Sequence, residues 1–187
     1  MLNDPFEWLG LNPARPGYTV RAFMPTAERV VLDGIGEMSR YEGTDTFEIT
    51  LNITQKENLP VHYRLNWIEK ASGEHHSVIS PYSFQPLISD FDLGLFAAGM
   101  HLHAYRFLGA HLRKIDGVDG CLFSVWAPNV KRVSVVGDFN GWHGLRHPMR
   151  SLGGSGVWEL FIPGLQAADS YKFEIRTQHD EILHKTD

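Results

Sequence analysis

The chain has 187 residues and a formal net charge of −5, and 43% of its residues are hydrophobic. This length suits one large domain or two small ones, and the acidic balance argues against nucleic acid or an anionic membrane as the partner. No apolar run approaches the ~20 residues of a membrane helix, and residues 1–6 lack the basic and apolar segments of a secretory leader. The single cysteine, Cys121, cannot form an internal disulfide, so we expect a cytoplasmic protein.

Short strands separated by turn residues dominate the first 84 residues. Residues 4–12 predict one short helical turn, because Asp4 suits an N-cap and Pro5 the first helical position. The stretches that follow predict strands, at residues 18–23, 29–32, 46–53 and 60–69, with a strand remnant at 80–84. Short strands at this spacing indicate a β-sandwich.

The same order of segments recurs in the second half of the chain. Residues 20–25 align with 123–128, 29–32 with 132–135, 47–49 with 158–160, and 63–65 with 171–173. Four matches in one order predict two sandwiches of similar design, one duplicated from the other. The second copy ends before any counterpart of Ser80-Pro81-Tyr82, so we expect the sequence to be the front of something longer.

Residues 90–112, between the two copies, follow a different pattern. Their apolar residues fit helical spacing better than alternation, and Gly94, Gly99 and Gly109 divide the segment into short pieces. The segment is too apolar for a flexible linker. We therefore predict an all-β protein in which short helices join two tandem sandwiches, with domains at residues 1–105 and 106–187.

The most informative stretch is residues 133–142, a strand that runs into a glycine-rich turn. Val133 and Val135 alternate with Ser134, as a half-buried strand requires. The residue types that follow tolerate tight or left-handed backbone, so the strand ends there. Trp142 comes directly after this turn, where an indole offers a flat apolar face to something flat and apolar such as a sugar ring.

Catalytic and metal-binding groups do not stand out. Glycoside chemistry needs two carboxyl groups about 5–10 Å apart, which the amylase-like class holds on a (β/α)₈ barrel of ~250 residues; this chain has neither that length nor that alternation. Asp138 is interpreted as a side chain that caps its own turn, and residues 153–156 as a hairpin turn. The ten histidines lack the spacing of a metal site and are interpreted as polar surface residues. We expect no catalytic residue, no metal and no cofactor.

The tryptophans and Lys172 differ in whether strand parity and turn position predict them to be buried or exposed. Trp158 shares strand parity with its apolar neighbours and is expected in the core, whereas Trp126 has the opposite parity and faces the other side or a neighbouring domain. Only Trp142 has a turn placement that suits ligand stacking. Lys172 alternates with two aromatic residues, so it should point away from the core. It is either a donor to sugar hydroxyls or an ordinary solvated lysine.

Several motifs closely resemble those of bacterial 1,4-α-glucan (glycogen) branching enzymes. They are residues 123–129 (FSVWAPN), 135–142 (VVGDFNGW), 147–150 (HPMR) and 156–163 (GVWELFIP), with Asp4-Pro5-Phe6 and parts of residues 92–111. The similarity covers essentially the whole chain. It implies two immunoglobulin-like sandwiches, the second being a glycogen-binding type of carbohydrate-binding module.

The resemblance also implies a role. In that family a catalytic barrel follows this region, and the whole enzyme transfers a cut α-1,4-glucan segment to a 6-hydroxyl. This piece would do none of that chemistry, but would place glucan chains and influence the length that is moved. In the related modules of AMP-activated kinase β subunits, a tryptophan stacks on glucose and a lysine lies in Tyr-Lys-Phe; Trp142 and Lys172 match them. A second stacking tryptophan there has no counterpart in residues 177–181, so weak binding is expected.

The implied partners are α-1,4-glucan or glycogen and the catalytic barrel of the same protein, which would dock on an exposed apolar patch. A self-standing adaptor that binds α-glucan and docks on a partner enzyme is the alternative. A structural module without a ligand is a third hypothesis.

Overall fold

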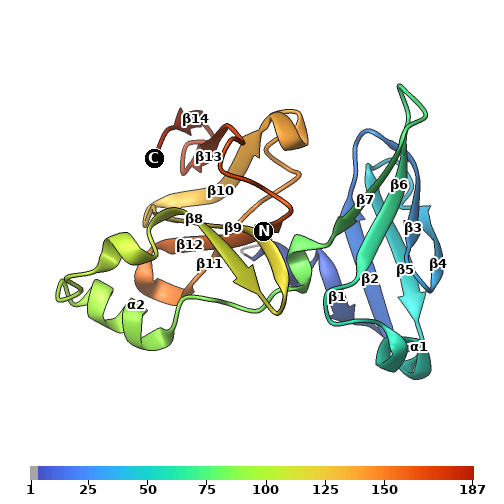
Figure 1. Cartoon of the computed structure of the whole chain (residues 1–187), viewed down its shortest axis with the longest axis horizontal. Helices are drawn as coiled ribbons and strands as arrows, with labels where there is room; N and C mark the ends of the chain where they lie inside the picture. The colour runs from blue at the N-terminus through green and yellow to red at the C-terminus, as the bar shows by residue number, and fades with distance from the viewer. Residues whose placement is uncertain (1–3) are drawn as a thin grey trace. The chain divides into compact units, whose positions relative to one another are not determined.

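The computed structural model describes residues 4–187, which divide into two compact units: one is Phe6–Phe84, and the other is Gln85–Asp187 together with residues 4 and 5 (Figure 1). Each unit is an immunoglobulin-like sandwich built from antiparallel strands. The prediction of an all-β protein with two tandem immunoglobulin-like sandwiches is confirmed, and the short helices α2 (Asp90–Ala97) and η3 (Ala104–Arg106) lie between them in the sequence. No helix among the described residues is long and apolar enough to cross a membrane.

The first unit is a curled sheet with the strand order β1-β2-β5-β4-β3-β6-β7. Its core contains side chains from both halves of the sheet, among them Val20, Val30, Phe47 and Leu65. The elements, in chain order, are η1 (Pro5–Glu7), β1 (Gly10–Pro13), β2 (Tyr18–Phe23), β3 (Ala27–Leu32), β4 (Gly36–Arg40), β5 (Thr46–Leu51), α1 (Ile53–Asn58), β6 (Arg64–Glu69), β7 (His75–Ile79) and η2 (Pro81–Ser83).

The second unit has two sheets, with the orders β11-β12-β9-β8 and β10-β13-β14. Its elements are α2 (Asp90–Ala97), η3 (Ala104–Arg106), β8 (Gly109–Ile115), β9 (Val118–Trp126), β10 (Val130–Gly137), η4 (Asp138–Asn140), β11 (Arg150–Ser151), η5 (Gly153–Ser155), β12 (Val157–Pro163), β13 (Tyr171–Thr177) and β14 (Ile182–Lys185). Rings from the two sheets meet between them, where the Phe123 and Tyr171 centroids lie 4.8 Å apart. The turn at residues 153–156 connects β11 to its antiparallel partner β12, so the predicted hairpin is confirmed.

The two units share one strand order, which is the structural form of the predicted repeat. In the first unit, β4 pairs with both β3 and β5 and so joins the two halves of the sheet. In the second unit, residues 147–149 hydrogen-bond to β10, and the next two residues form β11 beside β12. The corresponding segment of each unit, β4 in the first and residues 147–151 in the second, therefore links the two halves of its sandwich.

Residues 85–108 cover the outer face of the β11-β12-β9-β8 sheet. Ile88 and Phe107 are buried against Val157 of β12 and Leu152, with Phe96 of α2 packed beside them. All seven residues of β12 are buried as a result. Strands buried on both faces require a covering layer, and the covering segment therefore belongs to the second unit, whereas the sequence prediction placed residues 85–105 with the first. The expected domain boundary at residues 105 and 106 stays a prediction.

Several element boundaries differ from the prediction. The strand predicted at 46–53 ends at Leu51, because Asn52 caps α1: Asn52 Oδ1 accepts from the Gln55 amide and Gln55 Oε1 accepts from the Asn52 amide. The strand predicted at 60–69 begins at Arg64, the remnant at 80–84 is a 3₁₀ turn, and residues 109–112 belong to strand β8. The short strands β1, β4 and β7 were not predicted, since each is held by pairing with a longer neighbour.

Candidate functional site

The candidate site lies on the turn that follows β10. Two glycines shape this turn. A Cβ on Gly137 would collide with the Ser170 carbonyl oxygen and the Phe139 ring, and Gly141 has a left-handed backbone with φ 61°. The chain can therefore leave the sheet and reverse within five residues, as the sequence indicated.

Asn140 holds the turn together from inside. Its side chain is buried, its Nδ2 donates to the Val135 carbonyl at 2.8 Å, and its Oδ1 accepts from the Gly137 amide at 3.0 Å. Asn140 Nδ2 also lies 2.8 Å from His147 Nδ1, and because the side-chain nitrogen of Asn140 can only donate, this ring nitrogen is the acceptor. Every polar atom of this amide has a partner, which fixes the turn against the strand.

Trp142 is presented by this turn in an unusual backbone conformation. Its φ is 58°, in the left-handed region that bulky residues rarely adopt. Its side chain is 42% exposed, and its indole N–H donates to Asp138 Oδ1 at 2.8 Å. The indole is thus both oriented by a hydrogen bond and partly exposed to solvent, two conditions that favour aromatic stacking on a ligand.

Lys172 extends from the first part of β13, at the same end of the sheet. Its cross-strand partner is Val136, and the preceding pair joins Tyr171 to Gly137, where the turn begins. Trp142 returns to this point, because its amide donates to the Gly137 carbonyl at 2.9 Å. Lys172 is exposed while Phe173 is buried, so the predicted orientation away from the core is confirmed. The backbones of the two predicted residues are therefore brought together, and their binding role stays a prediction.

The other tryptophans have structural partners. Trp158 is in the core and donates to the Ala127 carbonyl at 2.8 Å, as its strand parity predicted. Trp126 lies on the outer face of the same sheet, where its ring meets Phe96 of α2 with centroids 6.3 Å apart. In the first unit, Trp8 lies against the Arg21 guanidinium at 4.0 Å and Trp67 stacks on His76.

Two family models match the chain. Residues 1–82 match the alpha-1,4-glucan branching enzyme GlgB, N-terminal domain, and residues 107–187 match Carbohydrate-binding module 48 (Isoamylase N-terminal domain). The 1,4-alpha-glucan branching enzyme GlgB of Hydrogenovibrio crunogenus is 52% identical over 99% of the chain and 26% of its own length. The corresponding enzyme of Thiobacillus denitrificans is 52% identical over 99% of the chain and 25% of its own length, and that of Methylococcus capsulatus is 50% identical over 97% and 24%.

The chain corresponds to the N-terminal region of the 1,4-alpha-glucan branching enzymes. It spans about a quarter of the length of the curated relatives that it matches. The turn with Trp142 and the strand with Lys172 both lie in the part that matches the carbohydrate-binding module.

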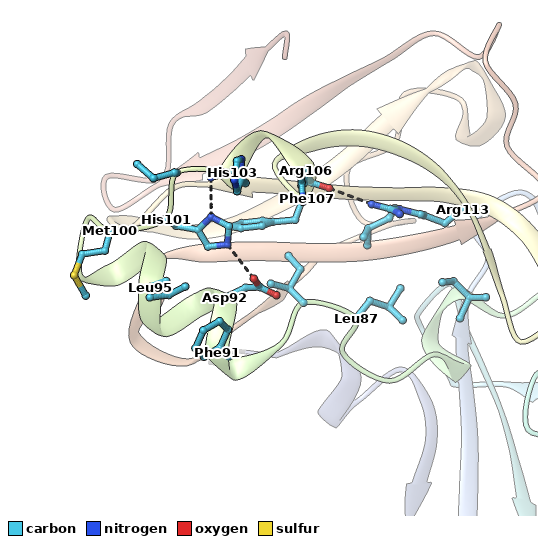
Figure 2. Close-up of a pocket in the computed structure, with 14 residues that line it drawn as sticks. Leu87, Phe91, Asp92, Leu95, Met100, His101, His103, Arg106, Phe107 and Arg113 are labelled. Carbon is cyan, nitrogen blue, oxygen red and sulfur yellow. Dashed lines mark hydrogen bonds and ion pairs between the residues drawn. The ribbon is translucent and has the colours of Figure 1, made fainter.

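A groove of 620 Å³ lies elsewhere in this branching-enzyme region, between α2, η3 and the outer face of β8 and β9 (Figure 2). Its walls are mostly apolar, and Arg106 and Arg113 lie at one side, where Arg113 Nη2 donates to the Arg106 carbonyl at 3.1 Å. Neither Trp142 nor Lys172 lines it. The groove and the turn that carries Trp142 are therefore separate features of one sandwich.

His101 corrects the expectation that the histidines are surface residues. Its side chain is only 9% exposed and lies beside the groove. Figure 2 shows the ring between two partners: Nε2 donates to Asp92 Oδ1 at 2.9 Å, and Nδ1 accepts from the His103 amide at 3.2 Å. Hydrogen bonds from Ser89 and His101 hold the pKa of the Asp92 carboxyl below its ordinary value. The two hydrogen bonds of the His101 ring hold the segment after α2 against that helix.

Two residues of the turn had functions that sequence reasoning missed. Asp138 was expected to cap its own turn, but its carboxylate accepts from the indole of Trp142. Asn140 was grouped with residues that tolerate left-handed backbone, but it is the buried hydrogen-bonding centre of the turn. The four-residue separation of Asp138 and Trp142 was the available signal for their contact.

Proposed function

We propose that the second sandwich binds α-1,4-glucan, with Trp142 stacking on a glucose ring and Lys172 donating hydrogen bonds to its hydroxyls. The observation that carries the proposal is the exposed indole of Trp142, oriented by Asp138 on a turn that Asn140 fixes. The match to a carbohydrate-binding module supports the ligand class, and the relatives, which are 1,4-alpha-glucan branching enzymes, support the linkage. An oriented ring loses little freedom on binding, which favours recognition.

The proposed role is to position glucan chains for glycogen branching and to influence the length of the transferred segment. The bond cleavage and transfer would belong to a (β/α)₈ barrel in the part of the relatives that this chain does not span. We expect this region by itself to carry no branching activity and to act in the cytoplasm.

The same proposal assigns a partner to the second sandwich. Phe91, Met100 and Leu102, here called the apolar patch, are 74%, 63% and 87% exposed. An exposed apolar surface of this kind is typical of an interaction site. The curated relatives have about three times as much additional polypeptide, since the chain spans 26% of one of them. We propose that this additional part of a branching enzyme packs on the apolar patch.

Titration of residues 1–187 with maltoheptaose, followed by amide chemical shifts, tests the glucan site. One exposed aromatic contact contributes about 1 kcal/mol, so Trp142→Ala should weaken binding about fivefold, and Lys172→Ala should weaken it about twofold. Trp126→Ala is the matched control, because Trp126 is 55% exposed but lies on the outer face of the other sheet.

Unchanged affinity in Trp142→Ala would exclude this site. Equal losses in Trp142→Ala and Trp126→Ala would show that binding is not specific to the turn. Failure of the unsubstituted chain to bind would favour a structural module without a ligand.

A further inference from the structure

The Asp138 carboxylate restricts the side-chain rotation that the turn leaves to Trp142. The turn fixes the backbone of Trp142, because the Trp142 amide donates to the Gly137 carbonyl. Gly137 is itself closely packed, and a Cβ at that position would collide with the Ser170 carbonyl oxygen. The indole can still rotate about its side-chain bonds. The 2.8 Å hydrogen bond from Nε1 to Asp138 Oδ1 selects one orientation of the ring.

The left-handed backbone of Trp142 is a second observation at the same place. A tryptophan at φ 58° is disfavoured relative to glycine, which occupies that region without a clash of its Cβ. The neighbouring Gly141 already has a left-handed backbone, so the turn carries a bulky residue where glycine would fit better. Strained residues of this kind cluster where a side chain must be held in a defined place for binding.

The second oxygen of Asp138 has no hydrogen-bond partner among the described residues. Asp138 is exposed, and within residues 4–187 its only side-chain hydrogen bond joins Oδ1 to the indole. Oδ2 therefore retains its capacity to accept. An ionised carboxylate accepts hydrogen bonds from hydroxyl groups, and these charge-assisted bonds are stronger than neutral ones. A sugar stacked beside the carboxylate would present such hydroxyls.

We propose that Asp138 is part of the glucan site: Oδ1 positions the Trp142 ring, and Oδ2 accepts from a hydroxyl of the glucose unit stacked on that ring. The inference rests on the proposed function of Trp142. It differs from a turn-stabilising role, in which Asp138 would affect folding and leave the affinity of the folded protein unchanged.

The first measurement follows the indole N–H of Trp142 by ¹H–¹⁵N correlation spectroscopy without ligand. Trp142→Phe identifies this resonance by removing it. Asp138→Ala should shift it and speed its exchange with water, because the acceptor is lost. Asp138→Asn should keep it close to its original position, because the amide oxygen can still accept from the indole.

The second measurement is the affinity of each variant for maltoheptaose. Asp138→Ala should weaken binding about fivefold and Asp138→Asn about twofold, since the amide restores the ring position but not the charge. In a Trp142→Phe background, which keeps a ring without the N–H, Asp138→Ala should cost less than it does beside the indole. Asp119→Ala is the control, because Asp119 is an exposed carboxylate of the β8–β9 hairpin with a side chain 77% exposed.

The outcomes separate the two proposals. If Trp142→Ala loses affinity while Asp138→Ala binds like the unsubstituted chain, Asp138 has no part in the site and the glucan site itself stands. If neither substitution changes affinity, the proposed function fails. Should Asp138→Ala disturb the whole spectrum, Asp138→Asn decides, because loss of affinity without a shift of the indole N–H supports the contact from Oδ2, and full affinity contradicts it.

Discussion

The Trp142 turn depends on a neutral His147 ring, which accepts a hydrogen bond from the side chain of Asn140. Its Nδ1 accepts from Asn140, and its ring lies 5.7 Å from that of Phe139. Burial, with a smaller contribution from the positive charge of Arg146, lowers the pKa of His147 to about 3. A protonated ring would place a second donor against the amide nitrogen of Asn140, so the folded turn requires the neutral form.

Acid should therefore destabilise the second sandwich through His147. The pKa of this histidine is lower in the folded state than its unfolded value of about 6.5, so its contribution to stability is complete above that pH and is lost as pH falls from 6.5 toward 3. Between pH 7 and pH 5 the free energy of unfolding should fall by about 2 kcal/mol through this residue. The measurement is urea unfolding as a function of pH.

A matched pair of variants isolates that effect. His147→Gln keeps an acceptor for Asn140 but does not titrate, so it should remove the acid-dependent loss. His179→Gln changes an exposed histidine of the β13–β14 turn and should leave the loss in place. Identical pH dependence in all three proteins would contradict the role assigned to His147.

At the scale of elements, Glu159 of β12 attaches the covering segment to the sheet. Its carboxylate is buried and accepts from the Leu87 amide at 3.0 Å and the Ile88 amide at 2.8 Å, with Arg150 Nε 3.9 Å away. Burial raises the pKa of Glu159, while the two backbone amides and Arg150 act in the opposite direction. A buried carboxylate is tolerated only with such partners. This contact links residues more than seventy positions apart.

Removal of this carboxylate should loosen residues 85–105. Glu159→Ala leaves the buried Ile88 amide and the partly buried Leu87 amide without an acceptor and should cost about 2–3 kcal/mol of unfolding free energy. Glu159→Gln keeps one acceptor and should cost about 1 kcal/mol. Urea unfolding measures the cost, and the rate of limited proteolysis within residues 85–105 should rise in the same order. Glu42→Gln, at an exposed glutamate, is the control. Equal stability of Glu159→Ala and the control would show that the contact does not hold the segment.

At the scale of the whole molecule, the second sandwich has two separate surfaces, for which we propose different roles. The Trp142 turn belongs to the β10-β13-β14 sheet, and the apolar patch lies on the segment that covers the other sheet. The covering segment buries the outer face of the β11-β12-β9-β8 sheet, and its own apolar patch stays exposed to solvent. A partner that buries the patch would gain about 2 kcal/mol for each large side chain.

Substitution of the patch should affect the long polypeptide much more than the short one. In residues 1–187, Phe91→Ser with Leu102→Ser should leave the melting temperature nearly unchanged, because both residues are exposed there. In a polypeptide that continues this chain with the additional part of a branching enzyme, the same double substitution should lower the unfolding free energy by about 3–4 kcal/mol, because both side chains would lose their proposed burial. Val61→Ser, at a residue 77% exposed in the first unit, is the control. An unchanged stability of the long enzyme would exclude the patch as its packing surface.

The sequence by itself determined the local features. Alternation located β2, β3 and β10, and the residue types of positions 137–142 located the turn, because strand parity and turn geometry depend on neighbours within a few residues. The repeated order of segments predicted two sandwiches of one design. The capping box at Asn52 and Gln55 was also local, and its pattern was present but not used.

Only the tertiary structure decided what lies against the outer face of a sheet. The burial of β12 on both faces, of Glu159 and of His101 depends on residues 85–108 folding back over the second sandwich. Such burial comes from contacts between residues far apart in the chain, which no spacing within one strand encodes. The orientation of Trp142 by Asp138 is likewise a side-chain contact that exists only once the glycine turn has closed.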